Sequence, residues 1–218
     1  MNRIITLKGT GNISVKPDLI IITMDLESHK YDYEKTMELA AESVSILQNA
    51  IETAGFDKKD LKTTNFNIRT HYESYEDEND NYKNRFDGYI CKQGLKLEFD
   101  FNTEVLSKLL NAVGKAPVEP NLNIRFSVKD KEAVNEELLI RATENARKKA
   151  EILTKASGVI LGDLISIDYN WGEVHMYSNT RFMMNEDSIM SLKASAAPDI
   201  EPEDIDVSDT VTFVWEIK

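Results

Sequence analysis

The sequence has one cysteine, Cys91, among its 218 residues, so no internal disulfide can form. Cys91 lies in a stretch that is typical of a β-strand, and we expect a small buried or half-buried side chain there rather than a nucleophile. Histidine is also scarce, with His29, His71 and His175 only. None of them has another histidine or cysteine at the spacing of a metal site. The sequence therefore predicts no catalytic, metal-binding or cofactor-binding residues, and no cofactor.

Long apolar runs are missing as well. No segment approaches the roughly 20 apolar residues of a membrane-spanning helix. The N-terminal stretch MNRIITLKGTG has neither an apolar segment of about 7–15 residues nor a cleavage site, and an export signal requires both. If this is the native start of the chain, we expect a cytoplasmic protein with no membrane insertion.

Positive charge is in deficit. The chain has 26 lysines and arginines against 38 aspartates and glutamates, which gives a formal net charge of −12 at pH 7. Nucleic acids and anionic membranes bind to concentrated positive faces, so this acidic composition argues against both as partners. The one lysine-rich run, Arg147-Lys148-Lys149, lies between Glu144 and Glu151 and is interpreted as the solvated face of a helix.

A glycine pair near the N-terminus resembles the start of a dinucleotide-binding fingerprint. Gly9 and Gly11 have the first spacing of that motif, but the third glycine is absent and strand-like residues follow instead of a helix. A phosphate site of this type needs both the third glycine and the helix. We therefore expect a turn at residues 9–11.

An acidic segment resembles a calcium-binding loop. Asp77, Asn79 and Asn81 match the first three ligand positions of an EF-hand, but Tyr82 stands where glycine is required and Gly88 where the bidentate glutamate belongs. Without that turn and that ligand, we expect a solvated hairpin tip within a polar loop at residues 74–85.

The longest regular pattern predicts a helix over residues 131–157. Its apolar stripe is spaced at three and four residues and consists of Val134, Leu138, Ala142, Ala146, Ala150 and Leu153. Asp130 is placed to cap the first turn, and Gly158 suits the left-handed position after the last. At about 1.5 Å per residue the helix is roughly 40 Å long. Since the middle of the stripe is alanine, the helix backbone is expected to lie close to the surface that it covers.

The rest of the chain predicts strands and two further helices. Asp32 is expected to cap the first helix and Gly55 to end it. The closing strand alternates apolar residues and has no proline to block its edge. The expected strands are 3–8, 13–15, 18–28, 61–75, 86–101, 121–128, 164–177 and 205–217, the helices are 32–54 and 103–113, and a loop is expected at 178–202.

These elements form two similar halves, about 18–101 and 121–217, each in the order strand, helix, strand, long loop, strand. Gly55 is followed by Asp60-Leu61 and Gly158 by Asp163-Leu164, at the same offsets. Because a βαββ unit leaves one sheet face bare, two units can join faces or edges to cover it. The prediction is an α+β fold of two βαββ repeats in one domain over 1–218, with antiparallel or mixed sheets and one long helix packed on a sheet. The alternative is coincidence, since this helix-to-strand connection is common.

The two halves also suggest one alternative for the histidines. His71 and His175 lie near the far ends of matching strands. If the halves are related by a pseudo-symmetry axis, these two residues would approach each other across it. We favour solvated histidines, and a metal site formed by the two residues is the alternative.

Four segments carry a resemblance to a known family. They are GTGNISVKPD at 9–18, AGFDKKDLKT at 54–63, Gly88-Tyr89, and the run ARKKAEILTKASGVILG at 146–162. With them the chain resembles, over nearly its full length, the SIMPL-domain family, which includes the YggE-type stress-associated proteins and the periplasmic immunogenic proteins of bacteria. The resemblance implies an α+β fold, a tendency to form higher oligomers and no established enzymatic activity. Two departures from the family are expected. Many relatives carry an export signal, which we do not expect in this chain, and the segment 111–124 lacks the glycine-rich approach expected before the next strand.

Three functions are consistent with this sequence. We expect first a non-enzymatic, self-associating protein whose cellular role is unassigned and for which the resemblance suggests a link to stress. The second is a small-molecule or peptide-binding module that uses a groove between the two βαββ units. The third is a hydrolase-like enzyme whose residues are brought together only by the fold. A broad symmetric contact would favour the first, an open apolar groove the second, and a deep pocket with perturbed titratable groups the third.

Overall fold

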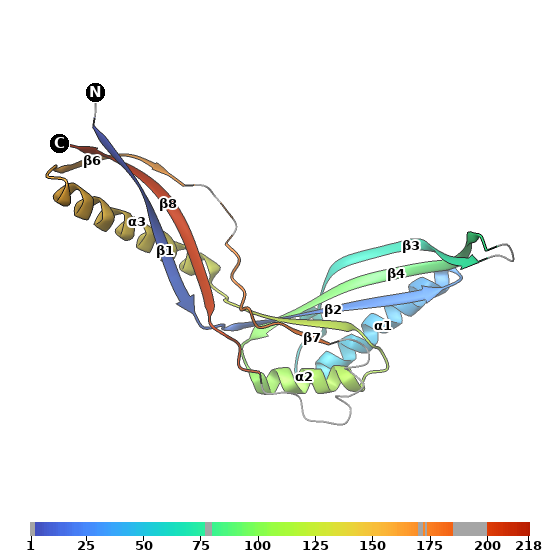
Figure 1. Cartoon of the computed structure of the whole chain (residues 1–218). Helices are drawn as coiled ribbons and strands as arrows, with labels where there is room; N and C mark the ends of the chain where they lie inside the picture. Colours follow the sequence, from blue (N-terminus) through green and yellow to red (C-terminus); the bar gives the residue numbers. More distant parts are fainter. Residues whose placement is uncertain (1–2, 77–79, 170–171, 173, 185–199) are drawn as a thin grey trace. The chain divides into compact units, whose positions relative to one another are not determined.

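The computed structural model describes residues 3–76, 80–169, 172, 174–184 and 200–218. It confirms an α+β fold with antiparallel strand pairs (Figure 1). The chain divides into two compact units. The first unit consists of Met1–Asp18, Ser127–Asn179 and Pro202–Lys218, and the second consists of Leu19–Phe126 and Thr180–Glu201.

The first unit is a three-stranded antiparallel sheet covered on one face by a long helix. The strand order is β1-β8-β6, so the closing strand β8 lies in the middle of the sheet. It was expected to offer a free edge, and that expectation is wrong because β1 and β6 pair with its two sides. The elements are β1 (Ile4–Val15), α3 (Lys131–Ala156), β6 (Leu161–Asp168) and β8 (Ile205–Ile217).

The stripe of α3 is buried as the periodicity predicts, except at its last member. Val134, Leu138, Ala142, Ala146 and Ala150 are all buried, whereas Leu153 is 45% exposed. The stripe continues instead at Thr154, four residues after Ala150, and its hydroxyl donates to the Ala150 carbonyl at 2.8 Å. The helix caps are confirmed, because the Asp130 carboxylate accepts from the Ala133 amide at 2.8 Å and Gly158 has a φ of 70°.

The glycine pair of β1 is not a turn. Residues 4–15 form one continuous strand that pairs with β8 in an unbroken register. A Cβ at Gly9 would collide with the carbonyl oxygen of Ala142, and a Cβ at Gly11 with that of Leu138. The two glycines therefore let the α3 backbone lie directly on the strand, which is the close approach predicted from the alanine stripe.

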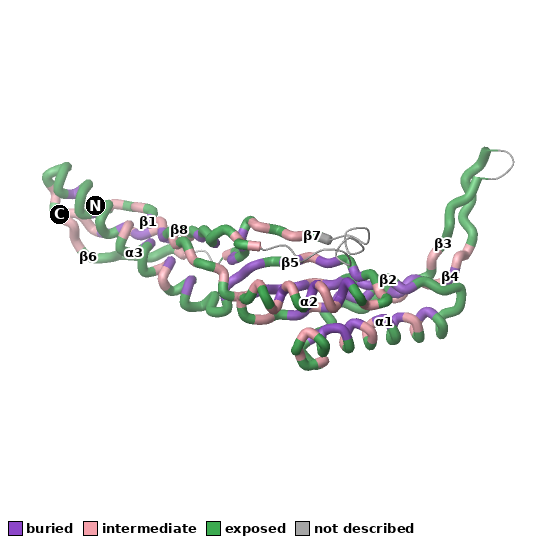
Figure 2. The backbone as a smooth tube through the Cα atoms, turned by 90° about the horizontal axis from the view of Figure 1, so that it is seen from below, coloured by how far each residue is buried: buried purple, intermediate pink, exposed green. Residues whose placement is uncertain are grey.

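The second unit is a five-stranded sheet with two helices. The strand order is β3-β4-β2-β5-β7. Its buried core joins the strands to α1 and α2, and the buried residues lie along the sheet-facing side of both helices (Figure 2). The elements are β2 (Leu19–Lys30), α1 (Tyr33–Thr53), η1 (Lys58–Asp60), β3 (Lys62–Glu76), β4 (Tyr82–Asp100), α2 (Thr103–Lys115), β5 (Asn121–Ser127) and β7 (Phe182–Met184).

Helix α1 begins and ends where the sequence predicts, but it is not capped as expected. Asp32 occupies the N-cap position, yet its side chain makes no capping hydrogen bond and instead pairs with Lys35 at 3.1 Å. Gly55 follows the helix with a φ of 102°, a conformation that favours glycine.

Three further expectations are corrected in detail. The polar loop at 74–85 is mostly a β-ribbon, because β3 continues to Glu76 and β4 starts at Tyr82; residues 77–79 lie outside the described part. The strand expected at 164–177 ends at Asp168. The loop expected at 178–202 contains the short strand β7, which pairs with β5 in the second unit. Whether the two halves descend from one repeated unit stays a prediction.

Candidate interaction surface

The two edges of the first unit's sheet differ in whether their outward backbone groups are hydrogen-bonded. On the β1 edge, side chains of α3 bond to the backbone groups that point away from β8. The Asn145 amide oxygen accepts from the Thr10 amide at 3.2 Å, Arg141 donates to the Asn12 carbonyl at 3.0 Å, and Lys149 donates to the Lys8 carbonyl at 3.0 Å. The β1 edge is therefore already covered by the protein's own helix.

This edge contact follows from the two repeat lengths. Four residues of an α-helix rise about 6.0 Å, and two residues of a strand rise about 6.7 Å. Arg141, Asn145 and Lys149 are four residues apart on one side of α3, and their partners are two residues apart in β1. Because the two rises nearly match, three successive side chains reach three successive outward groups. Lys149 thus belongs to the edge contact, although the sequence predicted only a solvated face for 147–149.

The opposite edge belongs to β6, which carries no strand on its outer side within the described residues. It is also apolar. Leu164 is 47% exposed, Ile165 52% and Ile167 56%, and Ile160 just before the strand is 71% exposed. We call Ile160, Leu164, Ile165 and Ile167 the β6 surface. A sheet edge that combines free backbone groups with exposed apolar side chains is a site for pairing with another chain.

A polar cluster joins β2, β3 and β4 of the second unit. Nε2 of His29 lies 2.5 Å from the Asp87 backbone carbonyl oxygen and 3.5 Å from the Asp87 carboxylate. Nε2 of His71 lies 3.8 Å from the same carboxylate. The two imidazole rings meet edge to face with centroids 5.2 Å apart. The neighbour of His71 is therefore His29, a pairing that the sequence analysis did not anticipate.

This cluster does not form a metal centre in the present geometry. Within the part of the chain that the structure describes, no group of three or more histidine, cysteine, aspartate or glutamate side chains could hold a metal ion. His175 belongs to the first unit and is exposed. The cluster thus places two imidazoles beside one carboxylate and one backbone carbonyl, an arrangement suited to hydrogen bonding.

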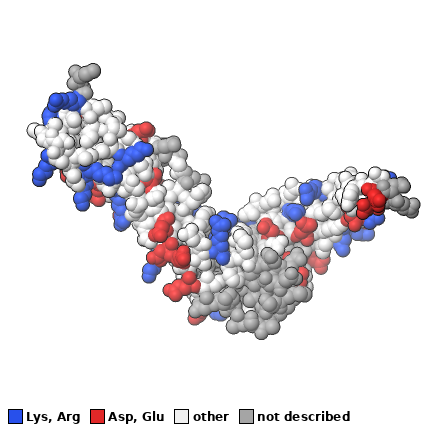
Figure 3. Space-filling model, viewed as in Figure 1, with Lys and Arg blue, Asp and Glu red and all other residues white. Residues whose placement is uncertain are grey.

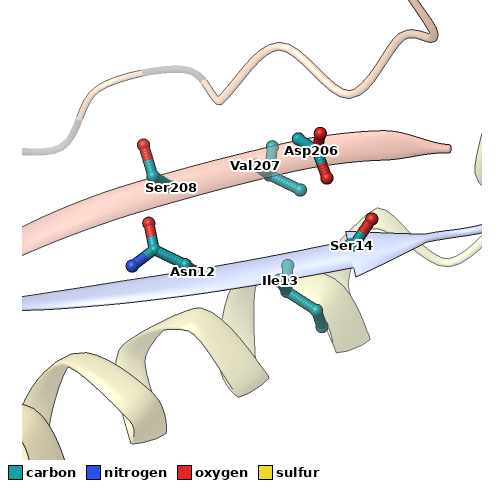
Figure 4. A pocket seen from close by; sticks show the side chains of 6 residues that line it. All are labelled: Asn12, Ile13, Ser14, Asp206, Val207 and Ser208. Carbon is teal, nitrogen blue, oxygen red and sulfur yellow. The ribbon is translucent and has the colours of Figure 1, made fainter.

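A shallow hollow of about 400 Å³ lies on β1 and β8 of the first unit (Figure 4). Asn12 faces Ser208 and Ser14 faces Asp206 in the strand register. In Figure 4 Ile13 points toward α3, whereas Asn12, Ser14 and Ser208 point away from it. The hollow offers amide, hydroxyl and carboxylate groups for hydrogen bonds, without the nucleophile-and-base pair that acyl transfer needs.

Cys91 is buried in β4, with 1% of its surface exposed. Burial raises the pKa of the Cys91 thiol, so the thiol stays protonated at neutral pH. Since the thiolate is the nucleophilic form, this geometry agrees with the structural role that the sequence predicts.

A comparison with protein-family models decides the family. The model of the SIMPL family, described as a protein of unknown function (DUF541), matches residues 5–215. The chain belongs to the SIMPL family. The match runs from β1 to β8 and so includes residues of both units.

Curated relatives agree with this assignment. An uncharacterized protein YggE from Edwardsiella ictaluri is 22% identical to this SIMPL chain over 213 residues, which is 98% of this chain and 86% of the relative. The 26 kDa periplasmic immunogenic proteins of Brucella melitensis and Brucella abortus are 26% and 25% identical over 163 residues. In both cases the match covers 75% of this chain and 65% of the relative, so the chain spans just under two thirds of those proteins.

The charge distribution on the surface and the polarity of the helices concern two classes of partner, nucleic acids and membranes. On the face that Figure 3 shows, lysine and arginine lie among aspartate and glutamate rather than in one concentrated positive area. Among the described residues, no helix is both long enough and apolar enough to cross a membrane.

The sequence analysis missed the β6 surface, although one local signal was present. The segment VILGDLISI at 159–167 has six apolar side chains, of which four are β-branched and two are leucines. They are Val159, Ile160, Ile165 and Ile167, with Leu161 and Leu164. That pattern predicts a strand buried on both faces. Only the strand order shows that this strand lies at an edge, where the same side chains are exposed.

Proposed function

We propose that this SIMPL protein is a non-enzymatic, self-associating protein whose contact between copies includes the β6 surface. The observation that carries the proposal is the contrast between the two edges of one sheet. The β1 edge is bonded to α3, whereas the β6 edge presents four aliphatic side chains, each at least 47% exposed. Proteins normally protect exposed strand edges, and an unprotected apolar edge favours a protein partner.

A second copy of the chain is the partner that needs no further assumption. Pairing along β6 would satisfy the outward backbone groups and bury aliphatic side chains at about 25 cal/mol per Å². A stable contact needs roughly 1,000 Å² or more, which is more than one strand edge supplies. The contact between copies must therefore extend beyond β6.

The test measures the mass in solution of the wild type and of two variants that carry new negative charges. Ile165→Asp together with Ile167→Asp places charge in the middle of the β6 surface. Ile140→Asp is the matched control, because Ile140 is 54% exposed on α3 and lies outside the β6 surface. Size exclusion with light scattering should give a multiple of 24.8 kDa for the wild type and for Ile140→Asp. The β6 double variant should shift to the mass of one chain, with an unchanged circular dichroism spectrum.

A wild type that stays at the mass of one chain would overturn the proposal. It would then favour the second candidate, a small-molecule or peptide-binding module. Within the second unit an apolar groove of about 480 Å³ runs along α1 and α2, and Ile46, Ala50, Ala112 and Pro117 are among its lining residues. The lining of this groove favours an apolar peptide segment as ligand. The test is to titrate hydrophobic peptides into the wild type and into the Ala50→Glu variant and to compare the two affinities. The variant should bind them more weakly. A groove between the two units, as first expected, stays a prediction.

A cytoplasmic location also stays a prediction. Two relatives are periplasmic by name, and location can differ among relatives of one fold. Fractionation of the native cells followed by detection of the protein decides between cytoplasm and periplasm. The suggested link to stress would be tested by comparing survival of cells with and without the protein.

A further inference from the structure

The cluster of His29, His71 and Asp87 joins side chains from three strands of the second unit. In the strand order β4 lies between β2 and β3. The backbones that carry the two histidines are therefore two strand spacings apart, which is roughly 9.6 Å. Their imidazole rings nevertheless approach each other to 5.2 Å between centroids. The two side chains thus converge from strands that do not pair with each other.

A β-bulge in β4 brings the carboxylate to the same place. The register of β3 and β4 shifts between Thr70 and Tyr72. Asp87 and Gly88 of β4 therefore both lie opposite His71, and Gly88 has a φ of 100°, a conformation that favours glycine. Bulges re-aim side chains and are frequent beside functional sites. Here one carboxylate oxygen of Asp87 lies 3.8 Å from Nε2 of His71 and 3.5 Å from Nε2 of the other histidine.

The two rings are spaced like two ligands of one metal ion. A zinc ion lies about 2.0–2.1 Å from each histidine nitrogen and holds its ligands tetrahedrally, so the centres of two bound imidazole rings are roughly 5 Å apart. The separation of 5.2 Å between the centroids of His29 and His71 agrees with this value. Their side chains are 39% and 37% exposed, so an ion can reach the rings and the rings can turn toward it.

In the present geometry a hydrogen bond takes the place of a metal bond. A carbonyl oxygen only accepts, so Nε2–H of His29 donates to the Asp87 carbonyl. Coordination through this nitrogen replaces that hydrogen bond, and Nδ1 then carries the ring proton. Among the described residues, no group of three or more histidine, cysteine, aspartate or glutamate side chains could hold a metal ion. The protein therefore supplies two ligands, and water occupies the remaining positions.

The charge beside the rings favours a cation. Asp87 lies within 4 Å of both Nε2 atoms. Arg85 also interacts with Asp87, but its main partner is Glu73. Arg69 shares the face of β3 with His71 and lies two residues away, which is about 6.7 Å along the strand. Because electrostatic energy falls with distance, an ion between the rings is attracted by Asp87 more strongly than it is repelled by Arg69.

We infer that His29 and His71 together bind a divalent transition-metal ion, with Zn²⁺ as the first candidate. Imidazole is a ligand for zinc, copper and nickel, whereas Mg²⁺ and Ca²⁺ prefer oxygen. The Asp87 carboxylate accepts a hydrogen bond from metal-bound water, as outer carboxylates at metal sites do. The bound ion ties β2 to β3 across β4. This site lies in the second unit, and it does not depend on self-association through the β6 surface.

The test is calorimetric titration of Zn²⁺ into the full chain without a histidine tag. The wild type should bind one ion per chain, and Mg²⁺ should not bind. His29→Gln and His71→Gln should each weaken zinc binding at least about tenfold, because a single imidazole does not chelate. His175→Gln is the matched control, since His175 is an exposed histidine of the first unit, and it should bind zinc like the wild type.

Thermal unfolding gives a second measurement. Zinc should raise the melting temperature of the wild type and of His175→Gln, but not that of the other two variants, because a ligand stabilises the state that binds it. Failure of the wild type to bind zinc, or equal binding by all four proteins, would overturn the inference. Loss of binding in His175→Gln, or one ion for every two chains, would also contradict it. Should His29→Gln not fold, His71→Gln alone decides, because Nε2 of His71 makes only the longer contact of 3.8 Å with Asp87.

Discussion

At the scale of single residues, the first unit depends on two glycines. Gly9 and Gly11 lie under the backbone of α3, where any Cβ would collide with the carbonyl oxygens of Ala142 and Leu138. Neither glycine has a positive φ, so contact with the helix rather than chain conformation requires them. These glycines also allow the three α3 side chains to reach the β1 edge, because a lifted helix would draw them away.

Replacement of Gly9 by alanine should therefore destabilise the protein. The added methyl group has no space, and overpacking of this kind costs about 1–3 kcal/mol. Urea unfolding followed by circular dichroism should show a loss of about 2 kcal/mol or more. Gly172→Ala is the control, since a Cβ there meets nothing within 4 Å, and it should change stability by less than about 0.5 kcal/mol. Equal effects of the two substitutions would contradict the close approach of α3 to β1.

The single thiol offers a probe of the second unit. Because Cys91 is buried and its pKa is raised by burial, its reaction with an aromatic disulfide at pH 8 should be at least about 100-fold slower in the native protein than in urea. Reaction has to wait for an opening of the structure. The folded protein holds the thiol proton more tightly than the unfolded chain. Protonation of Cys91 therefore favours the folded protein at low pH, and this contribution to the free energy of unfolding is lost as the pH rises above the pKa of a thiol in the unfolded chain, about 8.5. Fast native reaction would place Cys91 at the surface.

At the scale of elements, α3 makes two kinds of contact with the sheet of the first unit. Its alanine stripe covers the sheet against Val211, Phe213 and Trp215, and one flank covers the β1 edge. The free energy of unfolding should therefore be sensitive to charge on the stripe and insensitive to charge on the solvent side.

The pair Ala146→Glu and Lys148→Glu tests this division. Ala146 is fully buried, so a glutamate there would be oversized and desolvated, with an expected loss of about 3 kcal/mol or more. Lys148 is exposed, and its replacement should change stability by less than about 0.5 kcal/mol. Thermal unfolding of both variants is the measurement. Equal melting temperatures would mean that the buried face of α3 is assigned wrongly.

The ribbon of β3 and β4 should be dispensable for folding. Ser74 faces Asn84 in the register and donates to its side chain at 2.7 Å. Replacing residues 75–83 by Asn-Gly would close the ribbon at this pair with a turn suited to hairpins. Because loop entropy depends weakly on length, the loss in unfolding free energy should stay below about 2 kcal/mol. A larger loss would show that the ribbon is part of the folded core.

Local patterns predicted the elements that depend on local physics. The helices α1 and α3 start and end within a residue or two of the expected bounds, since caps, apolar period and the glycines Gly55 and Gly158 act over a few residues. The order of strands was not predictable in this way. The alternation of β8 is compatible with an edge or a central strand, and only pairing with β1 and β6 decides it.

The candidate interaction surface could not be predicted from local sequence patterns either. The exposure of Ile165 and Ile167 depends on the edge position of β6, and the contact of His29 with His71 depends on pairing across three strands. The glycines Gly9 and Gly11 were interpreted as a turn because the sequence does not show which helix will lie on them. In each case the missing information is a contact between distant segments.

At the scale of the whole molecule, net charge opposes association and apolar burial favours it. Each chain carries −12, but at 0.15 M salt repulsion is screened beyond about 8 Å. Contacts at the β6 surface act at shorter range than that. Association should therefore be stronger at physiological salt than at low ionic strength, the reverse of what a contact dominated by ion pairs would show.

The most direct test of self-association is sedimentation velocity of the wild-type protein over a range of micromolar concentrations at 0.15 M salt. The proposed function predicts a mass above the 24.8 kDa of one chain, increasing with concentration. A mass of 24.8 kDa at every concentration would contradict it.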